Sequence, residues 1–419
     1  MQQLAVYSTL AMTVGLVAVR PSWGARTLSP ALVAAAAVLL CALFGAVGAG
    51  EVAAAAVAVW RALVTIASLM VTTEVAHRVG LLGWAAARVE ARARGARGLF
   101  VAVFLLGLAA ATALNNDAAI ILMTPLVLAL VARVYPGRPE LALPFATAVF
   151  ASAGVAPLVV SNPMNAIAAD MAGIDFLPYA ARMAPVAAVV AGVTLVTLLI
   201  VFRRALASAP VLSREAASPT PLASAAQRRV LGVIGGALVA YAAVGWAGGP
   251  VWAAAAVGAV AALAVAGDAL GDRRARLAVR AVSWETLGFL VGILILVGGL
   301  RQVGFIDLLA GTYRDAGAAQ VGVTATLGSA VLNNHPMAVV NVMALDAVAA
   351  PPAHVFAALV GGDLGPRLLP CGSLAGLLWL ELLRRNGVRV SLRRFVGVDM
   401  AITAPALAAA LLVLALLSW

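Results

Sequence analysis

The sequence lacks lysine altogether and carries little charge of either sign. Only 11% of its 419 residues are charged, whereas 64% are hydrophobic. This leaves too few polar side chains to cover the outside of a water-soluble protein of this length. The apolar runs are long enough to cross a bilayer as helices, and the alternating pattern of membrane β-strands is missing. The sequence therefore predicts an all-α polytopic membrane protein.

Cysteine is nearly absent as well. The only two, Cys41 and Cys371, lie in separate apolar segments. This excludes a disulfide framework and a Cys-x-x-Cys metal site. The first residues, Met1-Gln-Gln, form no basic region ahead of the first apolar run, so we expect no cleaved signal peptide. We also expect no cofactor.

All 28 basic residues are arginine, and the formal net charge is +11. In a soluble protein this excess would suggest a nucleic-acid partner. Here the arginines gather in short segments between apolar runs, which is the pattern of the positive-inside rule, so we expect no nucleic acid. All but five of them fall in predicted cytoplasmic segments; Arg301 and Arg314 fall outside, and Arg61, Arg182 and Arg367 fall in or beside spans. The predicted location is the inner (plasma) membrane, with both termini outside.

We predict about ten membrane-spanning helices in two halves, residues 1–202 and 230–419. A cytoplasmic linker, 203–229, rich in Ser, Pro, Ala and Arg, divides them. The arginine-rich stretch 78–97 is predicted to be a loop. The uninterrupted spans fall at about 4–19, 30–48, 52–74, 178–202, 230–247, 251–267, 284–300 and 395–419.

Two polar clusters interrupt the most apolar parts of the chain. Leu114-Asn-Asn-Asp117 lies within residues 98–132, and Leu332-Asn-Asn-His-Pro336 lies within 320–349. Such side chains are costly inside a membrane unless something binds to them. The first segment has basic flanks on both sides, so we predict a re-entrant hairpin that opens to the cytoplasm. The second has no basic flank and should open outward.

Two further apolar segments are predicted to be broken helices. Residues 141–172 are interrupted at Ser161-Asn-Pro-Met-Asn165, and residues 355–380 contain Gly361-Gly-Asp-Leu-Gly-Pro366 and Pro370-Cys-Gly-Ser-Leu374. Similar intervals separate the two polar clusters and the two breaks. An odd number of crossings lies between equivalent elements, which gives the halves opposite orientation. Inverted repeats with paired broken helices are typical of secondary transporters whose site lies at the bilayer midplane.

At that midplane the helix breaks would present free backbone groups and helix dipoles. Neutral side chains would add donors and acceptors, a lining that suits a small polyhydroxylic or weakly charged solute. An anion would call for an arginine clamp, and only Arg367 is near. The candidate binding residues are Asn115, Asn116, Ser161, Asn162, Asn165, Asn333, Asn334 and Ser373.

Asp117, Asp363 and His335 are the candidates for proton coupling, because ionisable groups inside a membrane usually carry function. Each has a structural alternative. Either aspartate could cap a helix N-terminus at a break. His335 could form a hydrogen bond that steadies the second hairpin tip.

Several motifs resemble the arsenical pump membrane protein family, the ArsB-type arsenite and antimonite permeases of the ion transporter superfamily. The resemblance extends from about Trp60 to the last span. The motifs are Asn116-Asp-Ala-Ala-Ile-Ile-Leu-Met-Thr-Pro125, Val160-Ser-Asn-Pro-Met-Asn165, Asn333-Asn-His-Pro336, Gly362-Asp-Leu-Gly-Pro366 and Gly372-Ser-Leu-Ala-Gly-Leu-Leu-Trp379. The combination of the last two motifs is the most specific.

The resemblance implies two inverted repeats and export of trivalent arsenite and antimonite driven by protons. It also allows a cytoplasmic arsenite-stimulated ATPase as partner, and it adds Gly372 to the binding candidates. Thiophilic metals are normally captured by several thiolates, which this chain cannot cluster. Arsenite is therefore expected to bind as neutral As(OH)₃ through hydrogen bonds, with Cys371 giving at most one soft contact.

Four other functions remain open at this stage. A sodium/proton antiporter or an organic-anion carrier would share the fold. An intramembrane aspartyl protease is suggested superficially by Gly361-Gly-Asp363-Leu and Pro405-Ala-Leu407, but a second aspartate in a Tyr-Asp context is missing. A passive channel would not accumulate solute against a gradient.

Overall fold

The computed structural model of the chain describes residues 2–19, 22–23, 26–209, 222–271 and 274–417. These residues are helical throughout apart from loops and one antiparallel pair of two-residue strands, β1 (Ser22–Trp23) and β2 (Arg26–Thr27). The expectation of an all-α protein is confirmed. By length and composition, seven of the described helices can each cross a membrane: α3 (Ala49–Arg78), α5 (Gly95–Ala113), α6 (Asn116–Val134), α9 (Phe176–Val201), α11 (Ala225–Trp246), α15 (Trp284–Gln302) and α21 (Leu392–Leu416). The remaining apolar helices include α1 (Gln2–Val19), α2 (Pro30–Leu43), α12 (Val251–Val265) and α17 (Ala318–Leu332).

The two halves of the chain repeat one set of helix contacts. In the first half, α5 and α6 pack against α7 (Ala142–Ser152). In the second half, α17 and α18 (Asn334–Ala347) pack in the same way against α19 (Pro352–Leu364). Likewise α3 packs on α12 and α15 packs on α2, while α9 and α21 pack on each other. Each helix therefore meets the same kind of neighbour as its counterpart.

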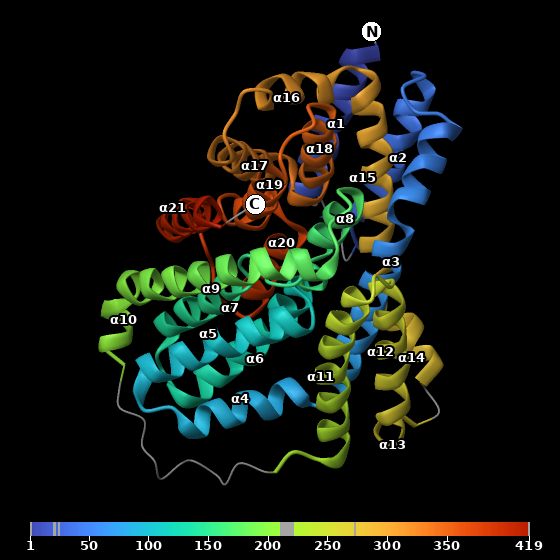
Figure 1. Cartoon of the computed structure of the whole chain (residues 1–419). Coiled ribbons are helices and arrows are strands. Elements are labelled where there is room, and N and C mark those ends of the chain that lie inside the picture. The colour runs from blue at the N-terminus through green and yellow to red at the C-terminus, as the bar shows by residue number, and fades with distance from the viewer. Residues whose placement is uncertain (1, 20–21, 24–25, 210–221, 272–273, 418–419) are drawn as a thin grey trace.

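The halves are interlocked by one short helix from each. Helix α8 (Pro163–Met171), which follows α7 after an irregular stretch, packs on α18 of the second half. Helix α20 (Leu374–Arg385), which follows α19 after a similar stretch, packs on α6 of the first half. In Figure 1, α8 accordingly rises toward the group of α15 and α18, and α20 lies near α7, on which it also packs. Neither half completes its helix packing without the other.

Close backbone approach between α17 and α19 positions the second break. A β-carbon on Gly365 would lie 2.3 Å from the carbonyl oxygen of Thr326, and one on Gly361 would lie 2.5 Å from that of Gly322. Gly361 and Gly365 have the four-residue spacing that lets membrane helices pack backbone to backbone. On another side of α19, Gly362 contacts Met164 of α8. Helix α19 is thus held between its own half and the other half.

The prediction of a loop over residues 78–97 is wrong, because the structure contains helix α4 (Leu81–Arg92) there. Leu81, Leu82 and Ala86 are buried along one side of α4, and its arginines lie on the rest. The high arginine content hid this short amphipathic helix, which has the character of a helix that lies along a membrane surface. Further short helices occupy other connections: α10 (Arg203–Ala207), α13 (Gly267–Leu270), α14 (Arg274–Ala281) and α16 (Phe305–Tyr313). Residues 210–221 of the predicted linker lie outside the described residues.

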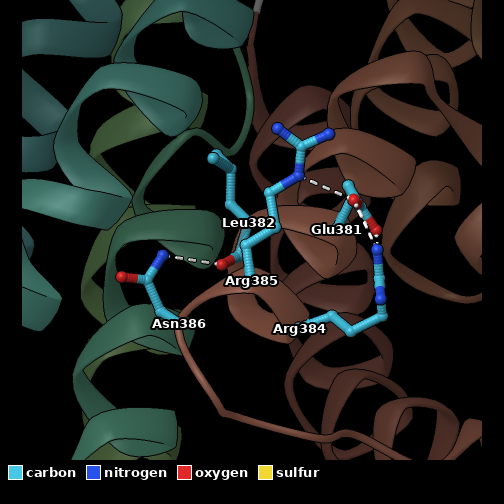
Figure 2. Close-up of polar contacts among 5 residues, drawn as sticks. All are labelled: Glu381, Leu382, Arg384, Arg385 and Asn386. Atoms are coloured by element: carbon cyan, nitrogen blue, oxygen red, sulfur yellow. Dashed lines mark hydrogen bonds and ion pairs between the residues drawn. The ribbon is translucent and has the colours of Figure 1, made fainter. Parts of the chain in front are cut away.

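The last turn of α20 is closed by an exposed polar cluster (Figure 2). Glu381 accepts hydrogen bonds from Arg384 Nε and Arg385 Nε, both at 2.7 Å. Asn386 Nδ2 donates to the carbonyl oxygen of Leu382 at 2.8 Å and so satisfies one free carbonyl of the helix end. Arginines at this end also match the negative pole of the helix. The cluster lies on the face that the arginine distribution predicts to be cytoplasmic.

Candidate functional site

Four helices begin at the predicted interruptions, and a polar side chain caps the N-terminus of each. The caps are Asn115 for α6, Asn162 for α8, Asn333 for α18 and Ser373 for α20, and they accept backbone N–H bonds at 2.9, 3.1, 3.3 and 3.0 Å. A capped N-terminus keeps further N–H groups free and carries the positive end of the helix dipole. Asn333 adopts a φ of +78°, a left-handed conformation that asparagine tolerates better than most residues.

Each hairpin tip is tied to the helix break of its own half. Ser161 Oγ donates to the carbonyl oxygen of Thr112 at 2.8 Å, just before the first tip. Asn333 Nδ2 donates to the carbonyl oxygen of Cys371 at 3.3 Å, and Cys371 Sγ donates to that of Ala330 at 3.4 Å. The second tip and second break are therefore joined in both directions.

Asp363 joins the two halves. Its Oδ1 accepts a hydrogen bond from Asn162 Nδ2 at 2.7 Å, and its Oδ2 accepts bonds from Asn165 Nδ2 and the backbone N–H of Ala156, both at 2.9 Å. Asn165 Nδ2 also donates to the hydroxyl of Tyr179 at 2.6 Å, and Tyr179 donates to the carbonyl oxygen of Ala156 at 3.1 Å. One carboxylate of the second half thus gathers three donors from the first break. Hydrogen bonds to an ionised acceptor are the strong ones.

Neither aspartate caps a helix, so that structural alternative is wrong. Asp117 is the second residue of α6, whose cap is Asn115, and Asp363 lies near the C-terminal end of α19. The alternative for His335 has support, because its Nδ1 lies 3.4 Å from Asn333 Oδ1 at the second tip. The same interval separates Asn115 from Asn333 and Asp117 from His335. The two tips therefore carry a carboxylate and an imidazole at equivalent positions.

Several buried polar atoms around these tips and breaks are without a partner among the described residues. They are Asn115 Nδ2, Asn165 Oδ1, Ser329 Oγ, Asn334 Oδ1 and His335 Nε2. Buried polar atoms are nearly always hydrogen-bonded in folded proteins, so a group of unsatisfied ones indicates a place for a ligand or water. The set contains both donors and acceptors and carries no fixed charge.

Other candidates are placed as follows. Asn116 is buried and its Nδ2 donates to the carbonyl oxygen of Gly154 at 3.4 Å. Gly372 lies where a β-carbon would come within 2.6 Å of Pro366 Cα, so only glycine fits this turn. Cys371 is partly exposed and is not in a disulfide.

Arg367 does not form an anion clamp. It is 2% exposed, its Nη2 donates to the carbonyl oxygen of Ala151, and its Nη1 donates to Thr194 Oγ1 at 3.5 Å. Its electrostatic partners are Asp363 and Asp399. Sequence reasoning missed Asp399 and Tyr179; for Asp399 the available signal was a lone carboxylate within the last apolar span.

Two cavities lie beside the first half. One, of about 470 Å³, is lined by Val159 and Val160 of the first break and by Arg61 and Asp170, whose charged atoms are 4.0 Å apart. The other, of about 650 Å³, lies between the C-terminal part of α6 and residues 386–394. The smaller cavity therefore opens directly beside the first break.

Comparison with known proteins agrees with this architecture. The family model described as "Arsenical pump membrane protein" matches residues 4–419. The chain is 33% identical to an arsenical pump membrane protein of Escherichia coli over 399 residues, covering 90% of this chain and 91% of that protein. It is 32% identical to one from Yersinia enterocolitica, covering 94% and 95% of the two chains.

A solved structure shares the fold. The YdaH transporter of Alcanivorax borkumensis, described as having an unusual topology, aligns with a TM-score of 0.62 over 99% of this chain and 98% of that chain, at 16% identity. The resemblance noted from the sequence motifs is confirmed by the family model and the relatives. This chain belongs to the arsenical pump membrane protein family and is a multi-pass transporter of the plasma membrane.

Proposed function

We propose that the chain exports trivalent arsenite and antimonite as a neutral As(OH)₃-like solute, in exchange for protons that move inward. The unsatisfied donors and acceptors at the tips and breaks carry this proposal. A trihydroxide offers three O–H donors and three oxygen acceptors, so it can satisfy a mixed set of amide, hydroxyl and imidazole atoms. An anionic substrate would require a cationic side chain beside those atoms, whereas Arg367 donates to Ala151 and Thr194 instead.

The proposal does not depend on bonds between arsenic and sulfur. Only two cysteines exist, and Cys41 is 1% exposed in the packed core. Cys371 is the one thiol at a break, and a single thiol gives one soft contact rather than the multidentate capture that thiolate sites provide. Binding through hydrogen bonds also allows release on the other side, which transport requires.

The proton is proposed to act on the contact between the halves. All three contacts of Asp363 are N–H donors, so both carboxylate oxygens must supply lone pairs. Protonation of Asp363 would place a donor against these donors and weaken the attachment of α19 to the first break. Asp117 and His335 supply further titratable positions, one at each tip. Binding a proton or a solute then changes which arrangement of the carrier is more stable, which is what alternating access requires.

Everted membrane vesicles test the proposal directly. Respiration acidifies their interior, so cellular export becomes uptake of radiolabelled arsenite, which should accumulate without ATP and collapse when a protonophore is added. Vesicles from cells without the chain are the control. Accumulation that follows a sodium gradient instead, or that requires ATP together with an ATPase subunit, would contradict proton coupling. Equilibration without accumulation would identify a passive channel.

A further inference from the structure

We propose that Asp399 is a second proton-binding carboxylate of the transport cycle and that it acts together with Asp363 through Arg367. The inference rests on the proposed function of proton-coupled export. It adds a residue of the last helix, α21, to a site that otherwise belongs to the two hairpins and the two breaks.

The first step is a balance of buried charge. Arg367 interacts electrostatically with both Asp363 and Asp399, and the turn that carries it packs on both α19 and α21. All three side chains are withdrawn from solvent, with exposures of 2% for Arg367, 6% for Asp363 and 2% for Asp399. Two carboxylates and one guanidinium leave one negative charge unmatched in a buried place, which is strongly unfavourable. One proton shared by the two carboxylates removes it.

The second step is where that proton belongs in this arrangement. Asp363 uses both oxygens as acceptors for N–H groups, which leaves no oxygen free of a donor. Asp399 Oδ1 is buried and has no hydrogen-bond partner among the described residues. The geometry therefore matches an ionised Asp363 and a protonated Asp399.

The third step is a polar path beside Asp399. Thr403 lies one helical turn further along α21, on the same face, and its hydroxyl is buried and unpartnered. Arg367 Nε is unpartnered as well. Three unsatisfied polar atoms in one neighbourhood are what an ordered water needs. Such a water would give the proton a place to pass.

No other charged group competes for this role. The elements packed against α21 are α9, α17, α19, the turn at Gly365–Arg367 and, through Phe395 near its start, α7 and α20. Helix α7 has no titratable residue, and the charged residues of α20 bond to one another at its C-terminal end. Helix α17 has no titratable or charged residue. The others carry Tyr179 and Arg182 on α9, His354 and Asp363 on α19, and Arg367 in the turn. Helix α21 itself has Arg393 and Arg394 at its start. Of these, Arg367 is the electrostatic partner of Asp399.

Asp363, Arg367 and Asp399 together then hold one proton, which can be on either carboxylate. When the proton is on Asp399, Asp363 is ionised and keeps its hydrogen bonds to the first break. The carrier moves the solute across the membrane in this arrangement. With the proton on Asp363, that contact weakens and Arg367 balances an ionised Asp399. In each cycle Asp363 takes a proton from water outside the cell as Asp399 gives its own to the cytoplasm, and the return step passes the proton from Asp363 to Asp399.

Asp399→Asn separates this mechanism from a purely structural role. The amide mimics a permanently protonated Asp399, so a proton on Asp363 would leave Arg367 without a counter-charge. Proton-driven arsenite uptake into everted vesicles should fall at least about tenfold. Exchange of labelled for unlabelled arsenite uses only the solute-carrying limb, so its rate should stay within about twofold of the wild type, because the solute limb keeps Asp363 ionised. Asp399→Glu should retain both activities, and so should Asp346→Asn, which alters an exposed carboxylate on α18.

The outcomes are distinguishable. If wild-type vesicles show no proton-driven uptake, the proposed function fails before this inference is reached. If the wild type accumulates arsenite and Asp399→Asn does so equally, or if folded Asp399→Asn loses exchange as well as uptake, the role of Asp399 is wrong. Should Asp399→Asn fail to fold, Asp399→Glu provides the test, because it keeps a carboxylate and should accumulate arsenite as the wild type does. A folded Asp399→Glu protein that exchanges arsenite but does not accumulate it would overturn the inference.

Discussion

Asp363 Oδ1 accepts a hydrogen bond from Asn162 Nδ2 at 2.7 Å, and this bond connects the broken helix of one half to that of the other. It lies inside a buried network with Asn165, Tyr179 and Ala156. The candidate site is therefore a shared contact between the halves as well as a set of polar side chains. The following predictions depend on that contact.

Asp363→Asn should abolish proton-driven arsenite uptake and also impair arsenite exchange. The amide nitrogen would face N–H donors, and the loss of charge-assisted hydrogen bonds of this kind costs about 1.5–3 kcal/mol, equivalent to roughly a ten- to hundredfold change. Uptake and exchange in everted vesicles measure both activities. Asp346→Asn is the matched control because that carboxylate is exposed on α18. Wild-type exchange by Asp363→Asn would show that the contact is dispensable.

Asn162→Asp should make transport and thermal stability depend on pH in a new way. The carboxylate can still cap α8, since it keeps the oxygen that accepts from Met164 N–H. At neutral pH, however, two carboxylates would face each other at hydrogen-bond distance, which is unfavourable until one binds a proton. Stability in detergent should therefore be below wild type at neutral pH and recover as the pH falls. A curve parallel to that of the wild type would contradict the pairing, and Asn162→Ala, which removes cap and contact together, should lose stability at every pH.

Gly365→Ala should destabilise the protein through packing alone. The added β-carbon would meet the carbonyl oxygen of Thr326 at 2.3 Å, and that backbone atom cannot move without separating α17 from α19. Overpacking of this kind costs about 1–3 kcal/mol, visible as a lower melting temperature in detergent. Gly311→Ala is the control, because nothing lies within 4 Å of its β-carbon position on α16. Equal melting temperatures for the two variants would refute this close approach.

Cys371→Ser should leave arsenite transport within about twofold of the wild type if the solute binds as a hydroxide. A serine hydroxyl can replace the thiol as donor to the carbonyl oxygen of Ala330. Initial rates of uptake at several arsenite concentrations provide the test. Loss of transport by a folded Cys371→Ser protein would mean that arsenic binds this thiol, and the proposed binding of a neutral trihydroxide would have to be abandoned.

The polar interruptions could be predicted because their cost is visible in the sequence. Asn115 and Asn333 lie in long apolar stretches that offer an amide no hydrogen-bond partner nearby. The cost of burying an unpaired amide therefore predicts that the helix is interrupted at these residues. Their partners could not be predicted in the same way. The contact of Asp363 with Asn162 depends on how the two halves pack, and no spacing in the sequence encodes which carboxylate reaches which amide.

Asp399 and α4 escaped prediction for opposite reasons. Asp399 is one charge in an otherwise apolar run, so the run dominates and the residue passes as part of a span. In α4, arginines dominate the composition, although Leu81 and Leu82 anchor one face of a helix. Average hydrophobicity describes a segment well and a single decisive side chain poorly.

The interlocking of the halves also bears on biosynthesis. Asn162 and Asn165 leave the ribosome about 200 residues before Asp363 does, and α8 is made about 170 residues before its neighbour α18. During that interval the first half holds amides in the membrane without their carboxylate. A fragment that ends in the linker should therefore be degraded when produced alone, whereas two fragments synthesised together in one cell should assemble into a working carrier.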